Sequence, residues 1–131
     1  MSTFSIVCRE SGPLTILALQ GRITLGDSSR SLLRVVEELV SAGHTQFLLD
    51  VAEVTHLDSS GLGTLLVSYN SLKAQGGSIG LLRAPRQVRE LLELSRLTTV
   101  FLLFDSEEDA LKQADGRRPS PVESQPAIPP R

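Results

Sequence analysis

The chain alternates between short apolar runs and longer segments with helical periodicity, and this alternation limits the folds that it can adopt. Two β-prone runs come first, at residues 4–10 and 14–21, and Ser11-Gly12-Pro13 between them is typical of a turn. Further apolar runs, each next to a helical pattern, lie at residues 46–51, 78–83 and 99–104. The order ββαβαβαβα predicts an α/β domain, with a mixed β-sheet and helices packed on it.

Two segments carry one apolar stripe each, at the three-to-four-residue spacing of an α-helix. The first helix should open at Gly26, Asp27 and Ser28 and end before Gly43, a suitable C-cap. Its stripe comprises Leu32, Val35, Val36, Leu39 and Val40. The stripe of the second helix, which Gly76-Gly77 ends, comprises Leu62, Leu65, Leu66, Tyr69 and Leu72. Both helices should therefore bury one side against the sheet.

Two more helices are expected in the last third of the chain. Pro85 suits the first turn of a helix. The inward side of that helix should comprise Val88, Leu91, Leu92 and Ser95. Ser106 and Asp109 form a capping-box-like pair before a short final helix, which we expect to end at about Ala114.

The composition changes after this last helix. Residues 115–131 hold five of the seven prolines of the chain and show no hydrophobic periodicity. Such a segment cannot bury enough apolar surface to offset its ordering. We therefore expect one domain, residues 1–114, followed by a disordered Pro-rich tail, residues 115–131.

Composition argues against several classes of function. A net charge of −2, no Trp and only five aromatic residues disfavour a nucleic-acid partner. The one cysteine, Cys8, excludes an internal disulfide and is expected to be a buried strand residue. No signal-peptide pattern or membrane-spanning run is found, so we expect a cytoplasmic protein without a membrane partner. A monomer is expected, because no second exposed apolar stripe is present.

Residues 57–63, L-D-S-S-G-L-G, place an acid, two hydroxyls and two glycines at the start of the second helix. Asp58 or Ser59 suits the N-cap, because its side-chain oxygen can accept an N–H of the first turn. The same N–H groups and the helix dipole favour an anion. The fold should therefore tolerate a phosphate on Ser59 or Ser60, which adds about −1.5 to −2 charges.

The second helix also has a row of hydroxyls opposite its leucine stripe. The row comprises Ser60, Thr64, Ser68 and Ser71, and no charged residue occurs between Ser59 and Lys73. Solvated helix faces usually carry Glu and Lys, so this pattern favours an exposed docking surface. The alternative is a merely solvated polar face.

These segments resemble the STAS domain of bacterial anti-sigma factor antagonists over nearly the whole body of the chain. The central motif carries most of the resemblance, and residues 47–54, F-L-L-D-V-A-E-V, are similar to the third strand of the family. Residues 91–97 are similar to its L-x-x-[ST]-G-L segment, with Arg96 in place of Gly. Residues 21–24, G-R-I-T, are similar to its G-x-[IL]-D segment, although Thr24 replaces the usual Asp.

The resemblance implies a non-enzymatic protein that binds an anti-sigma factor, itself a Ser/Thr kinase with a histidine-kinase-like ATP fold. The kinase would phosphorylate Ser59, with Ser60 as a secondary candidate, and thereby break the complex. A PP2C-type phosphatase would reset it. ATP and magnesium would belong to the kinase, so no cofactor is expected here. The implied partner-binding residues are Thr24, Asp27, Asp58, Ser59, Ser60, Gly61, Leu62, Gly63, Thr64 and Ser68.

Other interpretations remain open at this point. His56, Asp58 and Ser59 could supply the base, acid and nucleophile of a hydrolase, although such sequence neighbours rarely form a triad. Asp50, Asp58 and His56 could ligate a metal ion, although their spacing is poor. Residues 59–63, S-S-G-L-G, could form a loop that binds a free nucleotide, although they lack the Lys and the glycine spacing of a P-loop. Within the family, the alternative is a scaffold subunit of a signalling assembly, with a regulatory or silent Ser59.

Overall fold

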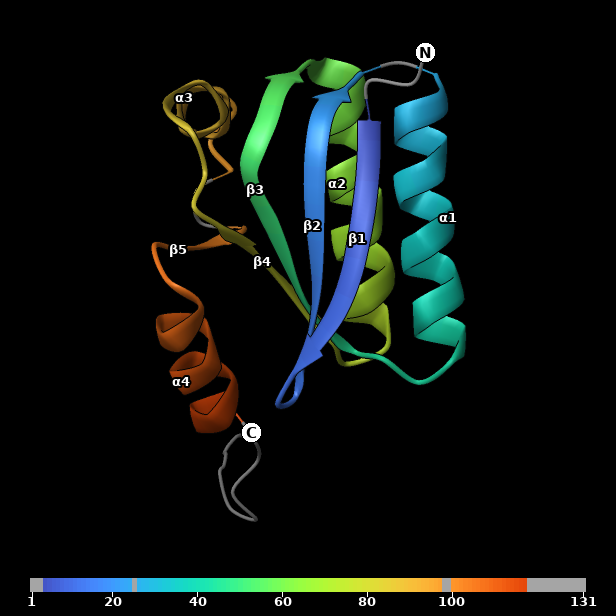
Figure 1. Cartoon of the computed structure of the whole chain (residues 1–131), viewed down its shortest axis with the longest axis vertical. Coiled ribbons are helices and arrows are strands. Elements are labelled where there is room, and N and C mark those ends of the chain that lie inside the picture. Colours follow the sequence, from blue (N-terminus) through green and yellow to red (C-terminus); the bar gives the residue numbers. More distant parts are fainter. Residues whose placement is uncertain (1–3, 25, 98–99, 118–131) are drawn as a thin grey trace.

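In the computed structural model, which describes residues 4–24, 26–97 and 100–117, the strands form one five-stranded sheet in the order β1-β2-β3-β4-β5 (Figure 1). The strands are β1 (Phe4–Ser11), β2 (Leu14–Ile23), β3 (Gln46–Leu57), β4 (Ser78–Leu82) and β5 (Leu102–Phe104). β1 pairs with β2 antiparallel, and the other neighbours pair parallel. The predicted hairpin and mixed sheet are confirmed.

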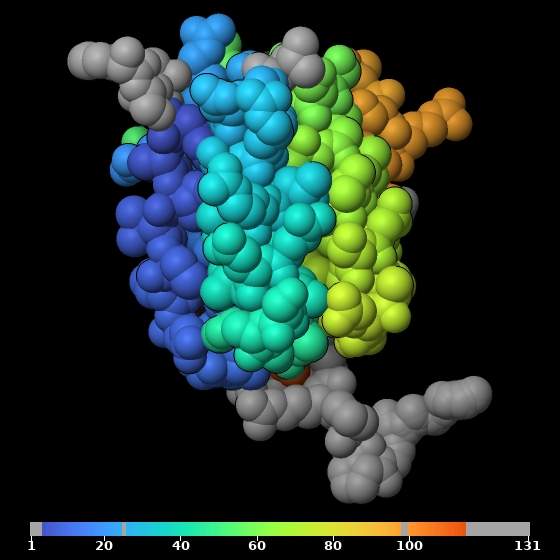
Figure 2. Space-filling view, turned by 90° about the vertical axis from the view of Figure 1, so that its right-hand side faces the viewer, coloured from blue at the N-terminus to red at the C-terminus, as the bar shows by residue number. Residues whose placement is uncertain are grey.

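The helices are α1 (Asp27–Ser41), α2 (Ser59–Ala74), α3 (Arg86–Leu94) and α4 (Glu107–Arg117). The order ββαβαβαβα is therefore confirmed. α1 and α2 lie side by side over one face of the sheet, as Figure 2 shows from outside. Among the described residues, no helix combines the length and the apolar character needed to cross a membrane.

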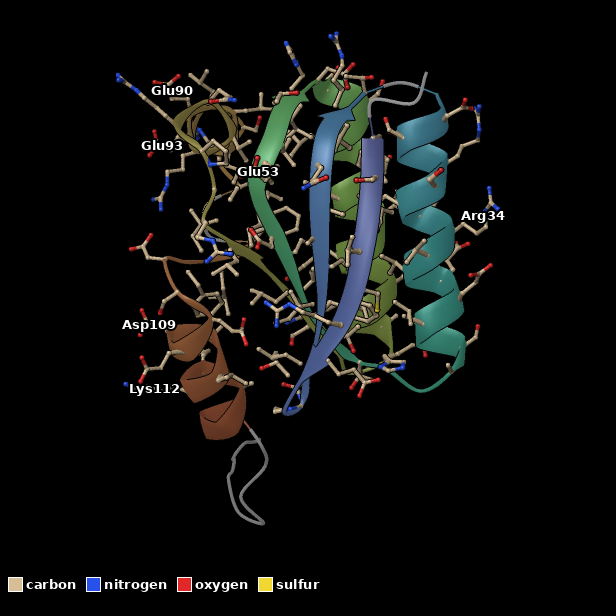
Figure 3. All side chains as sticks on the ribbon, viewed as in Figure 1. Arg34, Glu53, Glu90, Glu93, Asp109 and Lys112 are labelled. Carbon is tan, nitrogen blue, oxygen red and sulfur yellow. The ribbon has the colours of Figure 1, made fainter. Side chains whose placement is uncertain are left out.

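Both faces of the central strands are buried, which explains their continuous apolar runs. Alternate residues of a strand point to opposite faces, so Leu17 and Leu19 pack beneath α1 and α2, whereas Leu14 and Ile16 pack on the other face. That other face is covered in part by Ala110 and Ala114 of α4. Figure 3 shows Asp109 and Lys112 on the outer side of the same helix.

β3 is twice as long as the expected strand, because it continues from residue 51 to Leu57. It pairs with β4 only as far as Asp50, and beyond that point its register partners lie on β2. Beyond that point Glu53, Thr55 and His56 are exposed, while Val54 is buried. The polar residues between Ala52 and Leu57 therefore hid the continuation of the strand.

Three other expectations are corrected. Cys8 is exposed, because β1 is an edge strand. Ser95 is exposed at the C-cap of α3, one residue beyond the helix, and does not face inward.

Ser106 caps α4 as predicted, its Oγ accepting the N–H of Asp109 at 3.1 Å. α4, however, ends at Arg117, beyond the expected Ala114, while 118–131 of the expected tail lie outside the described residues.

The start of α4 is held to β1 by one carboxylate. Glu107 accepts hydrogen bonds from the Arg9 guanidinium at 2.6 Å and from the Ser11 hydroxyl at 2.7 Å. Both hydrogen bonds lower the pKa of Glu107 below its ordinary value, and the bond from Arg9 has the larger effect. The Arg9 side chain is 47% exposed and that of Glu107 is 32% exposed, so solvent screens the pair.

Replacing Glu107 by Gln should lower the free energy of unfolding at pH 7 by about 0.5 to 1 kcal/mol, the range for a screened ion pair. Because the folded pKa is lowered, the stabilisation is present above the unfolded value of about 4.3 and is lost as pH falls through the folded pKa. Urea denaturation of wild type and Glu107→Gln at pH 7 and pH 3 measures this. Glu108→Gln, at an exposed neighbour, is the matched control. If Glu107→Gln lowered the free energy of unfolding equally at both pH values, the stabilising ion pair of Glu107 with Arg9 would be contradicted.

Candidate functional site

The expected site lies where two parallel strands end together. Ile23 at the end of β2 is the register partner of Leu57 at the end of β3. α1 begins shortly after the first strand and α2 shortly after the second, so both helices start at the same edge of the sheet (Figure 1). In open α/β sheets, the carboxyl ends of the strands are the usual place for binding residues.

Asp58 caps α2. Its backbone is extended, and its Oδ1 accepts the N–H of Gly61 at 2.8 Å, while its carbonyl oxygen accepts the N–H of Leu62 at 2.9 Å. Of the two candidates for the N-cap, the structure therefore selects Asp58. Ser59 becomes the first residue of the helix, where its side chain is exposed.

Gly61 is buried because the first turn of α2 touches the end of β2. A Cβ atom at this position would lie 2.1 Å from the carbonyl oxygen of Ile23 and 2.9 Å from its carbonyl carbon. The same oxygen accepts the N–H of Asp58 at 3.4 Å. A Cβ on Gly63 would meet nothing within 4 Å. The two glycines of the motif thus differ, and only Gly61 is required by a close approach.

Thr24 is fixed by the first turn of α1. Its N–H donates to Ser28 Oγ at 3.0 Å, and its carbonyl oxygen accepts from the hydroxyls of Ser28 at 3.1 Å and Ser29 at 2.8 Å. Asp27 is exposed in that turn and forms an ion pair with Arg30 at 2.6 Å. Both residues therefore lie at the edge that holds the start of α2.

The expected partner-binding residues divide by burial. Asp27, Asp58 and Ser59 are exposed. Thr24, Ser60, Gly63 and Thr64 are partly exposed. Gly61, Leu62 and Ser68 are buried. The structure thus brings the first two groups to one surface, while Gly61 and Leu62 position α2 from beneath.

The predicted exposed row of hydroxyls on α2 is wrong at Ser68, which has no exposed surface. Ser68 lies beside α1, and Ser60, Thr64 and Ser71 are only partly exposed. The charge-free run therefore reflects a side of α2 turned toward its neighbour helix. The outer side instead carries Val67, which is 48% exposed, and Asn70. An apolar residue outside the leucine stripe was the sequence signal for this surface.

The side chains of the alternative hydrolase and metal sites are engaged with other groups. His56 Nδ1 lies 3.1 Å from the hydroxyl of Thr55, whereas Asp58 is engaged with the N–H of Gly61. Asp50 accepts from Arg83 at 2.6 Å. Within the described part of the chain, no three His, Cys, Asp or Glu residues are grouped so that they could hold a metal ion.

Comparisons with known proteins agree with this geometry. The model of the STAS domain family matches residues 5–110. An anti-sigma F factor antagonist of Paenibacillus polymyxa is 25% identical over 100 residues, which cover 76% of this chain and 86% of that protein. The chain therefore belongs to the STAS domain family, and the expected resemblance to anti-sigma factor antagonists is confirmed.

Solved structures show the same fold. An anti-sigma factor antagonist from Mycobacterium paratuberculosis has a TM-score of 0.76 at 20% identity, covering 86% of this chain and 94% of that one. The antagonist SpoIIAA in its unphosphorylated form has a TM-score of 0.72 at 21% identity, covering 86% and 96%. The phosphorylated form of SpoIIAA, a Bacillus cell fate determinant, has a TM-score of 0.66 at 20% identity, covering 85% and 98%.

Gly61→Ala should lower the free energy of unfolding by about 3 kcal/mol or more, because the new methyl group meets rigid backbone of β2. Gly63→Ala is the matched control in the same turn of the helix. It should raise stability by up to about 1 kcal/mol, since Ala is the better helix former and the space is open. Urea denaturation of both variants gives the two values, and equal effects would show that α2 does not press on Ile23.

Proposed function

We propose that this chain is a non-enzymatic anti-sigma factor antagonist that switches partners through Ser59. Unphosphorylated, it binds an anti-sigma factor Ser/Thr kinase with a histidine-kinase-like ATP fold. Phosphorylation of Ser59 by that kinase releases it, and a PP2C-type phosphatase restores it, in the cytoplasm. The observation that carries the proposal is the exposed hydroxyl of Ser59, placed directly after the Asp58 cap.

A phosphate at Ser59 changes the stability of the fold little. It lies outside the core, and the hydrogen bond from Gly61 to Asp58 does not involve it. The α2 dipole favours an anion there by about 0.3 to 1 kcal/mol. Repulsion by Asp58 in water is about 1 kcal/mol for unit charges 4 Å apart. The two contributions nearly cancel, so the modification acts on the surface and not on the fold.

The same phosphate acts strongly once a partner has displaced the water. For unit charges 4 Å apart, the interaction is about 4 kcal/mol at the effective dielectric constant of 20 near a protein surface. Each 1.4 kcal/mol changes affinity about tenfold. A partner that packs on Ser59, or places an acidic group beside it, would therefore lose two or three decades of affinity.

The relatives support this proposal. SpoIIAA, which shares the fold, has been solved in both an unphosphorylated and a phosphorylated form. Thr24, in place of the usual Asp, bears on recognition by the kinase. Its backbone is nevertheless held at the site by Ser28 and Ser29, so the replacement changes a side chain and leaves the surface in place.

Ser59→Asp should weaken partner binding tenfold or more, whereas Ser59→Ala should bind and resist phosphorylation. The first step is a quantitative pull-down from host lysate with wild type and both variants, and mass spectrometry to identify a protein with this kinase fold. The captured kinase is then purified, its affinities are measured, and phosphate transfer from ATP is followed. Ser95→Asp, at the exposed C-cap of α3, controls for added charge.

Three outcomes would contradict the proposal in different ways. Equal affinities for wild type and Ser59→Asp would remove the switch. Full labelling of Ser59→Ala would move the modification to Ser60 or Thr64. The same partners on every bait, with no kinase among them, would favour the scaffold alternative, in which Ser59 is silent.

A further inference from the structure

The two helices that cover one face of the sheet present different chemistry to the outside. α1 exposes five charged side chains, those of Asp27, Arg30, Arg34, Glu37 and Glu38. Figure 3 shows Arg34 pointing away from the molecule. α2 has no charged residue from Ser59 until Lys73, in its last turn. The helices lie side by side in one layer (Figure 2), so their depth in the molecule does not explain the contrast.

The outward side of α2 is a ridge formed by Ser59, Gly63, Val67 and Asn70, called the outer ridge below. These residues follow one another at spacings of four, four and three, so they lie on one side of the helix. The buried residues of α2, on its other side, are Gly61, Leu62, Leu65, Ser68 and Leu72. Ser59, Val67 and Asn70 are exposed, and Gly63 is partly exposed. A partner can therefore touch the whole outer ridge.

The fold does not require a glycine at position 63. A glycine inside a helix lowers stability by about 1 kcal/mol relative to alanine. Gly61 is necessary, because a Cβ there would lie 2.1 Å from the carbonyl oxygen of Ile23, whereas a Cβ on Gly63 would meet nothing within 4 Å. A missing side chain also lets a second backbone come close to the helix. The reason for Gly63 therefore lies outside the chain.

Val67 is the apolar member of the outer ridge, and it is 48% exposed. It lies eight residues after Ser59, which is about 12 Å along a helix that rises 1.5 Å per residue. A standard interface covers about 800 Å² of each partner, the area of a disc with a radius of about 16 Å. A kinase centred on Ser59 therefore covers Gly63 and Val67. Ala74, about 22 Å along the helix from Ser59, lies outside that disc.

We propose that the kinase docks on the outer ridge, with its backbone close to Gly63 and an apolar pocket around Val67. This inference rests on the proposed function and adds what the partner must offer, an uncharged and largely apolar surface. A charged group over Val67 would lose its water and find no opposite charge on the outer ridge. Ser59 then controls release, while Gly63 and Val67 supply affinity and selectivity for the kinase.

Gly63→Ala tests the close approach, because it separates binding from stability. The variant should be at least as stable as wild type in urea, yet bind the purified kinase about tenfold more weakly by titration calorimetry. Gly63→Leu should bind more weakly still. Ala74→Leu, at an exposed position near the end of the same helix, is the control for added bulk and should bind like wild type. Unchanged affinity of folded Gly63→Ala would overturn the close approach.

Val67→Ser and Val7→Ser are a matched pair for the apolar pocket. Both valines are exposed, Val67 by 48% and Val7 by 59%, and Val7 lies on the edge strand β1. Val67→Ser should weaken kinase binding about fivefold or more, and Val7→Ser should leave it unchanged. Equal effects of the two substitutions would overturn the pocket for Val67.

The outcomes distinguish this inference from the proposed function. Absence of any kinase partner, or equal binding of wild type and Ser59→Asp, would overturn the partner switch and the docking surface with it. A kinase that is lost with Ser59→Asp, but binds Gly63→Ala and Val67→Ser as tightly as wild type, would overturn the docking surface alone and leave the switch intact.

Discussion

The contact between the first turn of α2 and the carbonyl oxygen of Ile23 determines the geometry of this protein. A helix can start directly on the end of a neighbouring strand only if its inward residue has no side chain, and that residue is Gly61. The same contact places the Asp58 cap over the ends of β2 and β3 and turns Ser59 outward. The position of the hydroxyl is therefore fixed by backbone packing, which a change at the surface does not disturb.

The side of α2 that faces α1 carries small residues, and this determines how the two helices pack. Ser68 and Ser71 lie beside α1. One turn before Ser68, the hydroxyl of Thr64 donates back to its own helix, to the carbonyl oxygen of Ser60, at 3.2 Å. Ser68 makes no such bond in the described residues. α2 thus differs along its length, with an anion-favouring start and an unpaired buried hydroxyl in its second half.

Strand and helix order followed from periodicity alone, since both core faces are built from alternating apolar residues such as Leu17 and Ile16. The family followed from the motif, whose cap and glycine meet local requirements. Two features did not follow. Small hydroxyl residues suit both water and a closely packed helix, so the sequence did not reveal that Ser68 is buried. Nor did it reveal that Gly61 is required by Ile23, because that contact joins residues far apart in the chain.

The proposed release depends on what a partner places over the start of α2. A helix start leaves up to four N–H groups outside the helical ladder, and Asp58 accepts the one from Gly61. The remaining groups and the dipole favour an acidic group from a partner. A phosphate on Ser59 would satisfy the same groups from within the chain and would also repel that acid. One modification therefore removes an attraction and adds a repulsion, which explains how a switch can work without any change of fold.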